Sequence, residues 1–166
     1  MVFITLDGPG AVGKSTARDT TTAALRAAGH AVHPTTEPST GLIGTFTRAN
    51  ANEIHGHALA LLVASDRRHH LAVEVGPALA QGNTVLCDRY LPSSLVLQRL
   101  DGVPLDFILA INAGVTLPDL AVLLTAAPDL ILRRLASRGA HHRFELDAAD
   151  TVREVELYAE AVPVLN

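Results

Sequence analysis

The chain contains very little lysine, cysteine or aromatic side chain for its length. Its 166 residues include one lysine, one cysteine and no tryptophan, and aromatic residues make up 4% of the total. A lone cysteine, Cys87, excludes an internal disulfide, and its place at the end of an apolar run suits a buried thiol. The apolar runs, such as those at 59–64 and 120–127, are too short to cross a bilayer.

The charge pattern excludes further classes of protein. The net charge is −4 at pH 7, which argues against a general nucleic-acid-binding protein. A GTPase needs a guanine-reading Asn/Thr-Lys-x-Asp segment, and the single lysine, Lys14, does not lie in one. The N-terminus has no basic segment followed by an apolar one. We therefore expect a cytoplasmic protein with no membrane or nucleic-acid partner.

The remaining composition is that of one globular α/β domain spanning residues 1–166, since hydrophobic residues make up 48% and charged residues 18%. Short apolar runs predict strands at 2–5, 30–34, 84–88 and 120–125. Helical stretches alternate with them at 14–28, 53–81 (one helix or two abutting ones), 92–100, 104–113 and 128–137. This alternation predicts helices around a parallel sheet.

The segment GPGAVGKS at 8–15 carries the most specific chemistry. It follows a predicted strand, opens a predicted helix and matches the phosphate-binding pattern G-x-x-x-x-G-K-[ST]. In that pattern backbone N–H groups surround phosphate oxygens, Lys14 reaches the β- and γ-phosphates of ATP, and Ser15 binds Mg²⁺. A glycine-rich turn that merely caps a helix explains one glycine but not the position of the only lysine. The nucleotide-binding residues predicted here are Gly8, Ala11, Val12, Gly13, Lys14, Ser15 and Thr16.

A second polar segment, CDRY at 87–90, follows the third predicted strand. Ligands of open α/β sheets bind at the carboxyl ends of the strands, where this segment lies. Asp88 is positioned to hold the water shell of Mg²⁺, and Arg89 to bind a phosphoryl group in transfer. An Asp-Arg pair after a strand is usually a surface turn, but beside a phosphate loop the functional interpretation is favoured.

Five further segments, in their order and spacing, resemble the thymidylate kinase family over residues 2 to about 160. They are TEPSTGLIGTFTR, ASDRRHH, DRYLPSSLVLQ, LPDLAVLL and RRLASRGAHHRFE. The resemblance implies a P-loop nucleoside-monophosphate kinase fold, a three-layer sandwich with a central parallel sheet, and a lid at about 137–146. It also implies transfer of the γ-phosphoryl group of ATP to a nucleoside monophosphate with Mg²⁺, and a homodimer formed through the long central helices.

The resemblance assigns roles to particular residues. Arg48 and Arg89 resemble the pair that grips the acceptor phosphate, Arg67 resembles the arginine that meets the acceptor base, and Gln98 lies near the base pocket. Arg138 and Arg143 match the lid positions, and because the loop at 9–12 has no arginine, the lid is expected to supply the transition-state cation. The acceptor site implied in this way consists of Asp7, Glu37, Arg48, Val63, Arg67, Arg89, Ser94, Leu97 and Gln98.

Three positions at or beside this site depart from the family pattern. Gly10 replaces an acidic loop residue that holds the acceptor sugar, Val63 replaces a phenylalanine that stacks on thymine, and Leu97 replaces a tyrosine that lies against the sugar. The phosphate-handling residues are retained, so we expect the same chemistry with an altered acceptor pocket.

The C-terminal part also departs, because the family continues into another strand and helix. We expect residues 162–166 to begin that strand or the sheet to lack it. Two alternatives stay open at this point: a kinase for a nucleoside or another small hydroxyl compound, and an inactive nucleotide-binding relative.

Overall fold

A four-stranded parallel sheet forms the centre of the computed structural model, which describes residues 1–139, 145 and 147–164. Its strands are β1 (Phe3–Asp7), β2 (Val32–Thr36), β3 (Thr84–Asp88) and β4 (Leu120–Leu123), in the order β2-β3-β1-β4. Thr5 in the middle of β1 lies opposite Cys87 of β3 and Ala121 of β4. The four predicted strands and their parallel arrangement are confirmed.

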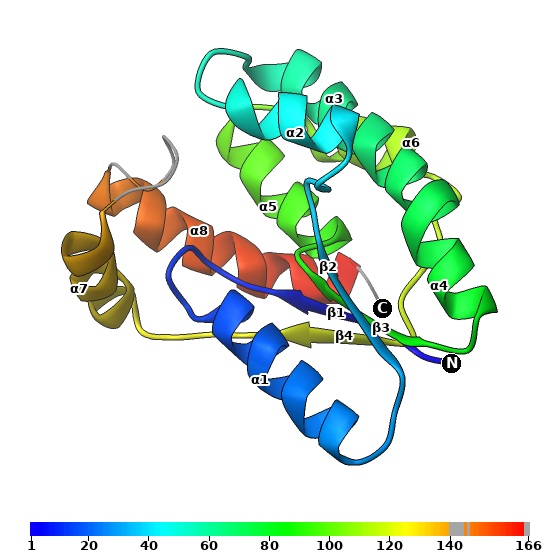
Figure 1. Ribbon diagram of the computed structural model, residues 1–166. Helices are drawn as coiled ribbons and strands as arrows, with labels where there is room; N and C mark the ends of the chain where they lie inside the picture. The colour runs from blue at the N-terminus through cyan, green and yellow to red at the C-terminus, as the bar shows by residue number, and fades with distance from the viewer. Residues whose placement is uncertain (140–144, 146, 165–166) are drawn as a thin grey trace.

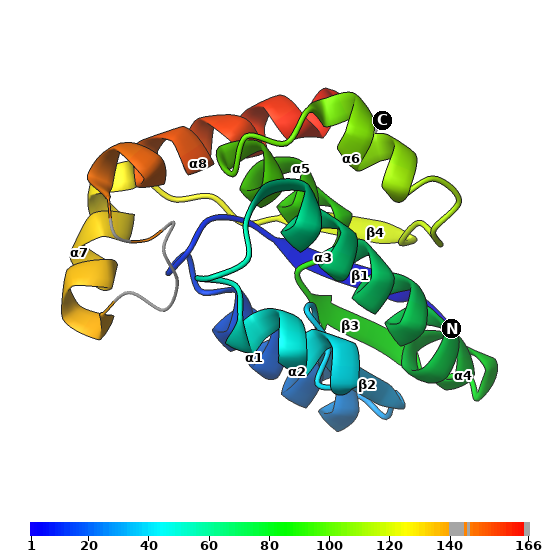
Figure 2. The same cartoon turned by 90° about the horizontal axis from the view of Figure 1, so that it is seen from above.

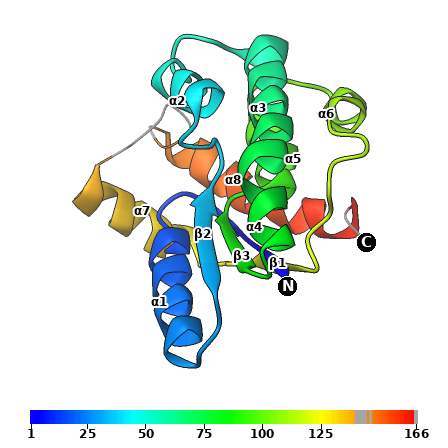
Figure 3. The same cartoon turned by 45° about the vertical axis from the view of Figure 1, so that its right-hand side comes forward.

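Helices fill the connections between the strands and also follow the last strand. They are α1 (Lys14–Ala27), α2 (Leu42–Ala49), α3 (Gly56–His70), α4 (Gly76–Ala80), α5 (Leu91–Leu100), α6 (Leu105–Ile111), α7 (Pro128–Arg138) and α8 (Ala148–Ala161). A π-helical turn, η1 (Leu71–Val75), joins α3 to α4, so the stretch predicted at 53–81 is continuously helical from Gly56 to Ala80. The sequence did not predict α2, which packs beside α3 (Figure 3), or α8.

The two faces of the sheet pack against different helices, which makes three layers (Figures 1 and 2). Leu6 and Leu86 lie on the face covered by α1, where Leu25 packs against them. Phe3 and Val85 point to the opposite face, toward Val75 and the helices that follow it. Successive side chains of a strand alternate between the faces, so these apolar strands are buried on both sides. The three-layer α/β fold that the sequence predicted is confirmed.

Of the two C-terminal outcomes expected from the sequence, a sheet without the further strand is the one found among the residues that the structure describes. Val162–Val164 form a short 3₁₀ helix, η3, that extends α8 rather than a strand beside β4. Pro163 has no backbone N–H to donate to a strand ladder, which disfavours pairing there. Among the described helices, none is long and apolar enough to cross a membrane.

Candidate active site

The phosphate loop joins β1 to α1 at the carboxyl end of the sheet, and its glycines are needed for its path. A Cβ atom at Gly8 would lie 2.3 Å from the backbone oxygen of Leu124, so the close approach of the two chains requires glycine. Gly13 has a φ of 109° directly before α1, a backbone conformation that L side chains rarely adopt. The loop therefore turns sharply and delivers Lys14 to the first turn of the helix.

The Lys14 ammonium lies inside this loop. Its Nζ donates hydrogen bonds to the backbone oxygens of Gly8, at 2.8 Å, and Pro9, at 2.7 Å. Burial and, to a smaller extent, the nearby Arg89 guanidinium lower the pKa of Lys14 to about 7, against the opposing charge of Asp88. A lysine with this pKa gains a proton readily when an anion binds beside it.

We expect ATP binding to take up protons because of this lysine. Bound phosphates raise the pKa of Lys14 from about 7, so between pH 7 and 9 its proton must come from solvent, and the affinity for ATP should fall as pH rises. Calorimetric titration in buffers of different ionisation enthalpy measures this uptake. In Lys14→Ala the uptake at pH 8 should be lost; an undiminished uptake would assign it to another group.

The residues predicted to hold Mg²⁺ lie together at the end of β3. The Ser15 hydroxyl donates a 2.6 Å hydrogen bond to Asp88 Oδ2, whereas the buried Asp88 Oδ1 has no hydrogen-bond partner among the described residues. A hydroxyl and a carboxylate are oxygen ligands of the kind that Mg²⁺ prefers. The donor set therefore fits a magnesium ion carried with the nucleotide phosphates.

A cavity of about 1260 Å³ opens beside the loop. A pocket for one small ligand has a volume of roughly 300–1,000 Å³, so this cavity has room for more than one. The predicted site residues that line it are Ala11, Val12, Gly13, Lys14, Ser15, Thr16, Glu37, Arg48, Val63, Arg67, Asp88, Arg89, Ser94, Leu97 and Gln98. Gly8 and Asp7 lie behind this lining, where Asp7 Oδ1 accepts hydrogen bonds from Ser93 and from the Tyr90 backbone.

Arg67 is held by four side chains from three separate segments. Its Nε donates to Glu37 Oε2 at 2.8 Å, one terminal nitrogen donates to Ser94 Oγ at 2.8 Å, and the other donates to Asn112. The guanidinium also lies over the ring of Tyr90, 5.1 Å from its centroid. With 1% of its surface exposed, Arg67 is fixed before any ligand arrives. Glu37 is thus bound to Arg67 within the wall of the cavity.

The two arginines predicted to grip a phosphate line the same cavity in different ways. Arg48, on α2, is exposed and donates to the backbone oxygen of Pro38. Arg89, with a left-handed φ of 72°, contacts Ser93 at 3.5 Å and the Tyr158 hydroxyl at 3.4 Å. No carboxylate of the described residues lies within 4.0 Å of the Arg89 guanidinium. Its charge is available for an anionic ligand.

Aromatic surface is scarce in the described lining. Tyr90 is its one aromatic residue, and that side chain is completely buried between Phe3 and Arg67. Val63 and Leu97 line the cavity where the family resemblance expects aromatic rings. The Gln98 Oε1 atom is buried there and accepts no hydrogen bond from the residues that the structure describes.

Sequence reasoning missed several residues that the fold brings to the site. Arg134 on α7 donates to the backbone oxygens of Ala11, at 3.2 Å, and Val12, at 3.0 Å. Glu145 lines the cavity, and a Cβ atom at Gly10 would lie 2.4 Å from its Oε1. Arg134 and Arg138 are one helical turn apart, and this spacing could have indicated that Arg134 also faces the site. Nothing in the sequence linked Glu145 to Gly10.

The lid is described in part. Arg138 ends α7, while Arg143 lies outside the described residues, as do most of the residues between α7 and α8. The lid at 137–146 and the roles of its two arginines stay predictions.

A phosphate loop, an oxygen donor pair that fits Mg²⁺ and arginine side chains around one cavity are the features of a P-loop phosphotransferase. A family model described as thymidylate kinase matches residues 6–164. The chain is 37% identical over 162 residues to a probable thymidylate kinase of Caldivirga maquilingensis, covering 94% of this chain and 79% of that protein. It is 43% identical over 152 residues to a thymidylate kinase of Deinococcus radiodurans, which covers 87% of this chain and 74% of that protein. The chain belongs to the thymidylate kinase family and is a nucleotide kinase.

Proposed function

We propose that this kinase transfers the γ-phosphoryl group of ATP to a nucleoside monophosphate other than thymidylate, through an altered acceptor pocket. The observation that carries this proposal is the combination of free phosphate-binding charge with an aliphatic acceptor wall. Arg89 and Arg48 suit an acceptor that already carries a phosphate. Val63 and Leu97 offer no ring to its base or sugar.

The proposed reaction is an in-line displacement. An oxygen of the acceptor phosphate forms a bond to the γ-phosphorus, the bond from that phosphorus to the β–γ bridging oxygen breaks, and ADP leaves with the electron pair. Lys14 and Arg89 would neutralise the charge that the phosphates bring together. Mg²⁺, held through Ser15 and Asp88, would supply further charge neutralisation on the ATP phosphates.

Two predicted features complete the proposal. Arg138 and Arg143 are proposed to add lid charge in the transition state, which would affect kcat more than ATP affinity. The homodimer through the central helices also stays a proposal; Leu61 of α3 and Val73 of η1 are exposed apolar residues there.

The acceptor pocket differs from the family pattern in its attraction for the base and in its shape. Stacking of a base on an aromatic side chain contributes about 1–3 kcal/mol, so a valine at position 63 should weaken thymidylate binding by roughly tenfold or more. The Glu145 carboxylate, which occupies the space of a Gly10 side chain, is a candidate to hold a sugar hydroxyl. Leu97 leaves room for a bulkier, modified or ribose-bearing acceptor.

We expect thymidylate to be a poor acceptor compared with another nucleoside monophosphate. An ADP-release assay of kcat/KM over the common ribo- and deoxyribonucleoside monophosphates, with nucleosides as controls, tests this directly. Val63→Phe with Leu97→Tyr should raise kcat/KM for thymidylate by about tenfold, because it restores base stacking. Val152→Phe, at a position with 40% exposure on α8, is the matched control and should change nothing.

Each outcome of this assay has a clear meaning. If thymidylate is the best acceptor by a wide margin, the altered-pocket proposal fails. The function is then the one in the relatives' names, thymidylate kinase. Transfer to nucleosides alone would favour the nucleoside kinase. ATP binding without transfer to any acceptor would indicate an inactive relative.

A further inference from the structure

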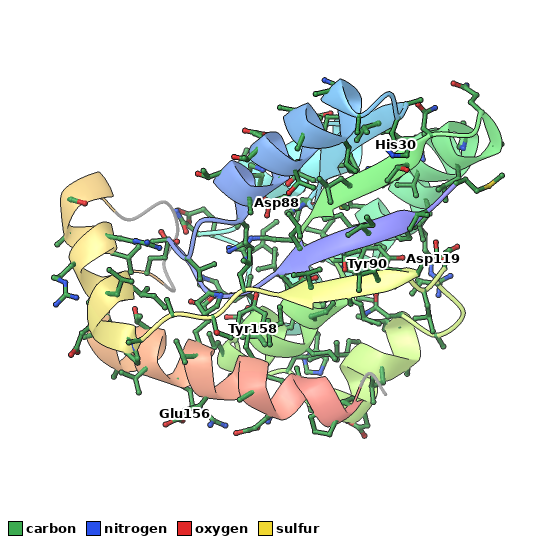
Figure 4. The ribbon with its side chains drawn as sticks, turned by 90° about the horizontal axis from the view of Figure 1, so that it is seen from below. His30, Asp88, Tyr90, Asp119, Glu156 and Tyr158 are labelled. Atoms are coloured by element: carbon green, nitrogen blue, oxygen red, sulfur yellow. The ribbon has the colours of Figure 1, made fainter. Side chains whose placement is uncertain are left out.

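A buried carboxylate lies beneath the phosphate loop and has no part in the chemistry described above. Glu154 is on the inner face of α8 with 1% of its surface exposed, and Tyr158, one helical turn later, is equally buried. Figure 4 shows Tyr158 turned toward the sheet and Glu156 turned away from it. Glu154 therefore belongs to the face of α8 that forms the floor of the phosphate site.

The contact that Glu154 makes is specific to one loop residue. The backbone N–H of Gly10 donates to both carboxylate oxygens, each at 3.2 Å. No ion pair within 4.0 Å joins Glu154 to a cation of the described residues. The loop N–H of Gly10 is thus directed at α8, away from the cavity that would hold the phosphates.

Stability does not explain this carboxylate. Burial raises the pKa of Glu154, because a charge taken out of water without an ion pair is disfavoured, although Arg89 and Lys14 oppose the shift. Replacing even a buried ion pair by apolar side chains is often neutral or stabilising, and Glu154 has no ion-pair partner among the described residues to lose. Among the described residues its hydrogen bonds go to the phosphate loop alone, and this placement of a buried carboxylate points to a role in the site.

We propose that Glu154 is a positioning residue that fixes the Gly10 peptide and so keeps the phosphate loop in its binding conformation. The loop has glycine at positions 8, 10 and 13, and glycine has the greatest backbone freedom of any residue. No side chain at position 10 restrains it. An acceptor atom supplied by α8 holds the middle of the loop while its later N–H groups face the ligand.

Two conservative variants separate the hydrogen bond from the charge. Glu154→Gln keeps an oxygen at the same reach and removes the charge, whereas Glu154→Asp keeps the charge and is too short to contact Gly10. We expect the Kd for ATP with Mg²⁺ to change less than about threefold in Glu154→Gln and to rise about tenfold or more in Glu154→Asp. ATP binding is measured without an acceptor, so this result does not depend on the acceptor proposed above.

A third variant and a control test whether the effect is merely structural. Glu154→Leu should keep or raise Tm while kcat falls by at least about tenfold, and Glu156→Leu on the outer face of α8 should leave the Kd and kcat unchanged. If Glu154→Asp binds ATP normally and Glu154→Gln binds it weakly, the charge and not the hydrogen bond is what matters, and the proposal would be overturned. If ATP affinity and kcat fall only as far as Tm falls in all three Glu154 variants, the proposal would be overturned in favour of a packing role.

Discussion

Lys14→Ala is expected to lower kcat for phosphoryl transfer by on the order of a thousandfold. The Lys14 ammonium is held inside the phosphate loop by the backbone oxygens of Gly8 and Pro9, where it is placed to contact the β- and γ-phosphates of ATP. Its loss removes a preorganised charge from the transition state, where such groups have their largest effects. The measurement is single-turnover transfer at saturating ATP, which separates the chemical step from binding.

The fold of this variant should remain intact. Burial lowers the pKa of Lys14, so the charged ammonium costs folding free energy and its removal should leave Tm unchanged or higher. Arg18→Ala is the matched control, since Arg18 is on the same helix and pairs with Asp19 at the surface. Near-normal turnover by a folded Lys14→Ala protein would contradict the assignment of the phosphate loop.

Arg89→Gly is expected to lower kcat/KM for the acceptor by about a hundredfold or more, with a smaller effect on the Kd for ATP. The guanidinium lines the cavity and has no carboxylate partner within 4.0 Å among the described residues, so its charge is available for the acceptor phosphate. Steady-state kinetics with the best acceptor from the screen, together with ATP titration, measures both effects.

Glycine is the informative substitution at this position. Arg89 has a φ of 72°, which strains a residue with a Cβ atom and does not strain glycine. Arg89→Gly should therefore keep Tm closer to that of the parent than Arg89→Ala does. Arg89→Lys keeps the charge without the planar fork and should recover part of the lost activity. Normal acceptor kinetics in Arg89→Gly would favour a nucleoside acceptor.

The local parts of this protein could be predicted from its sequence. The strands and the phosphate loop depend on neighbouring residues: β-branched apolar runs, glycines at fixed spacing, and a lysine directly before the serine of the helix start. The residues 87–90 could be placed beside the loop because parallel strands end at one edge of a sheet. Family membership followed from the same motifs, which the comparisons confirm.

The tertiary structure decided the features that depend on residues distant in the chain. Arg67 is fixed by partners 27 to 45 positions away, and Gly10 is bound by Glu154, 144 positions later. The sequence did not even predict α8, because the helix lies beyond the motifs that identify the loop. Hydrophobic periodicity and short motifs report on residues within a few turns of one another, whereas these contacts arise only when the sheet brings separate segments together. The amino-acid sequence by itself identified the phosphate-loop motif; the packing of α8 and the segment before it determined which carboxylates lie against that loop.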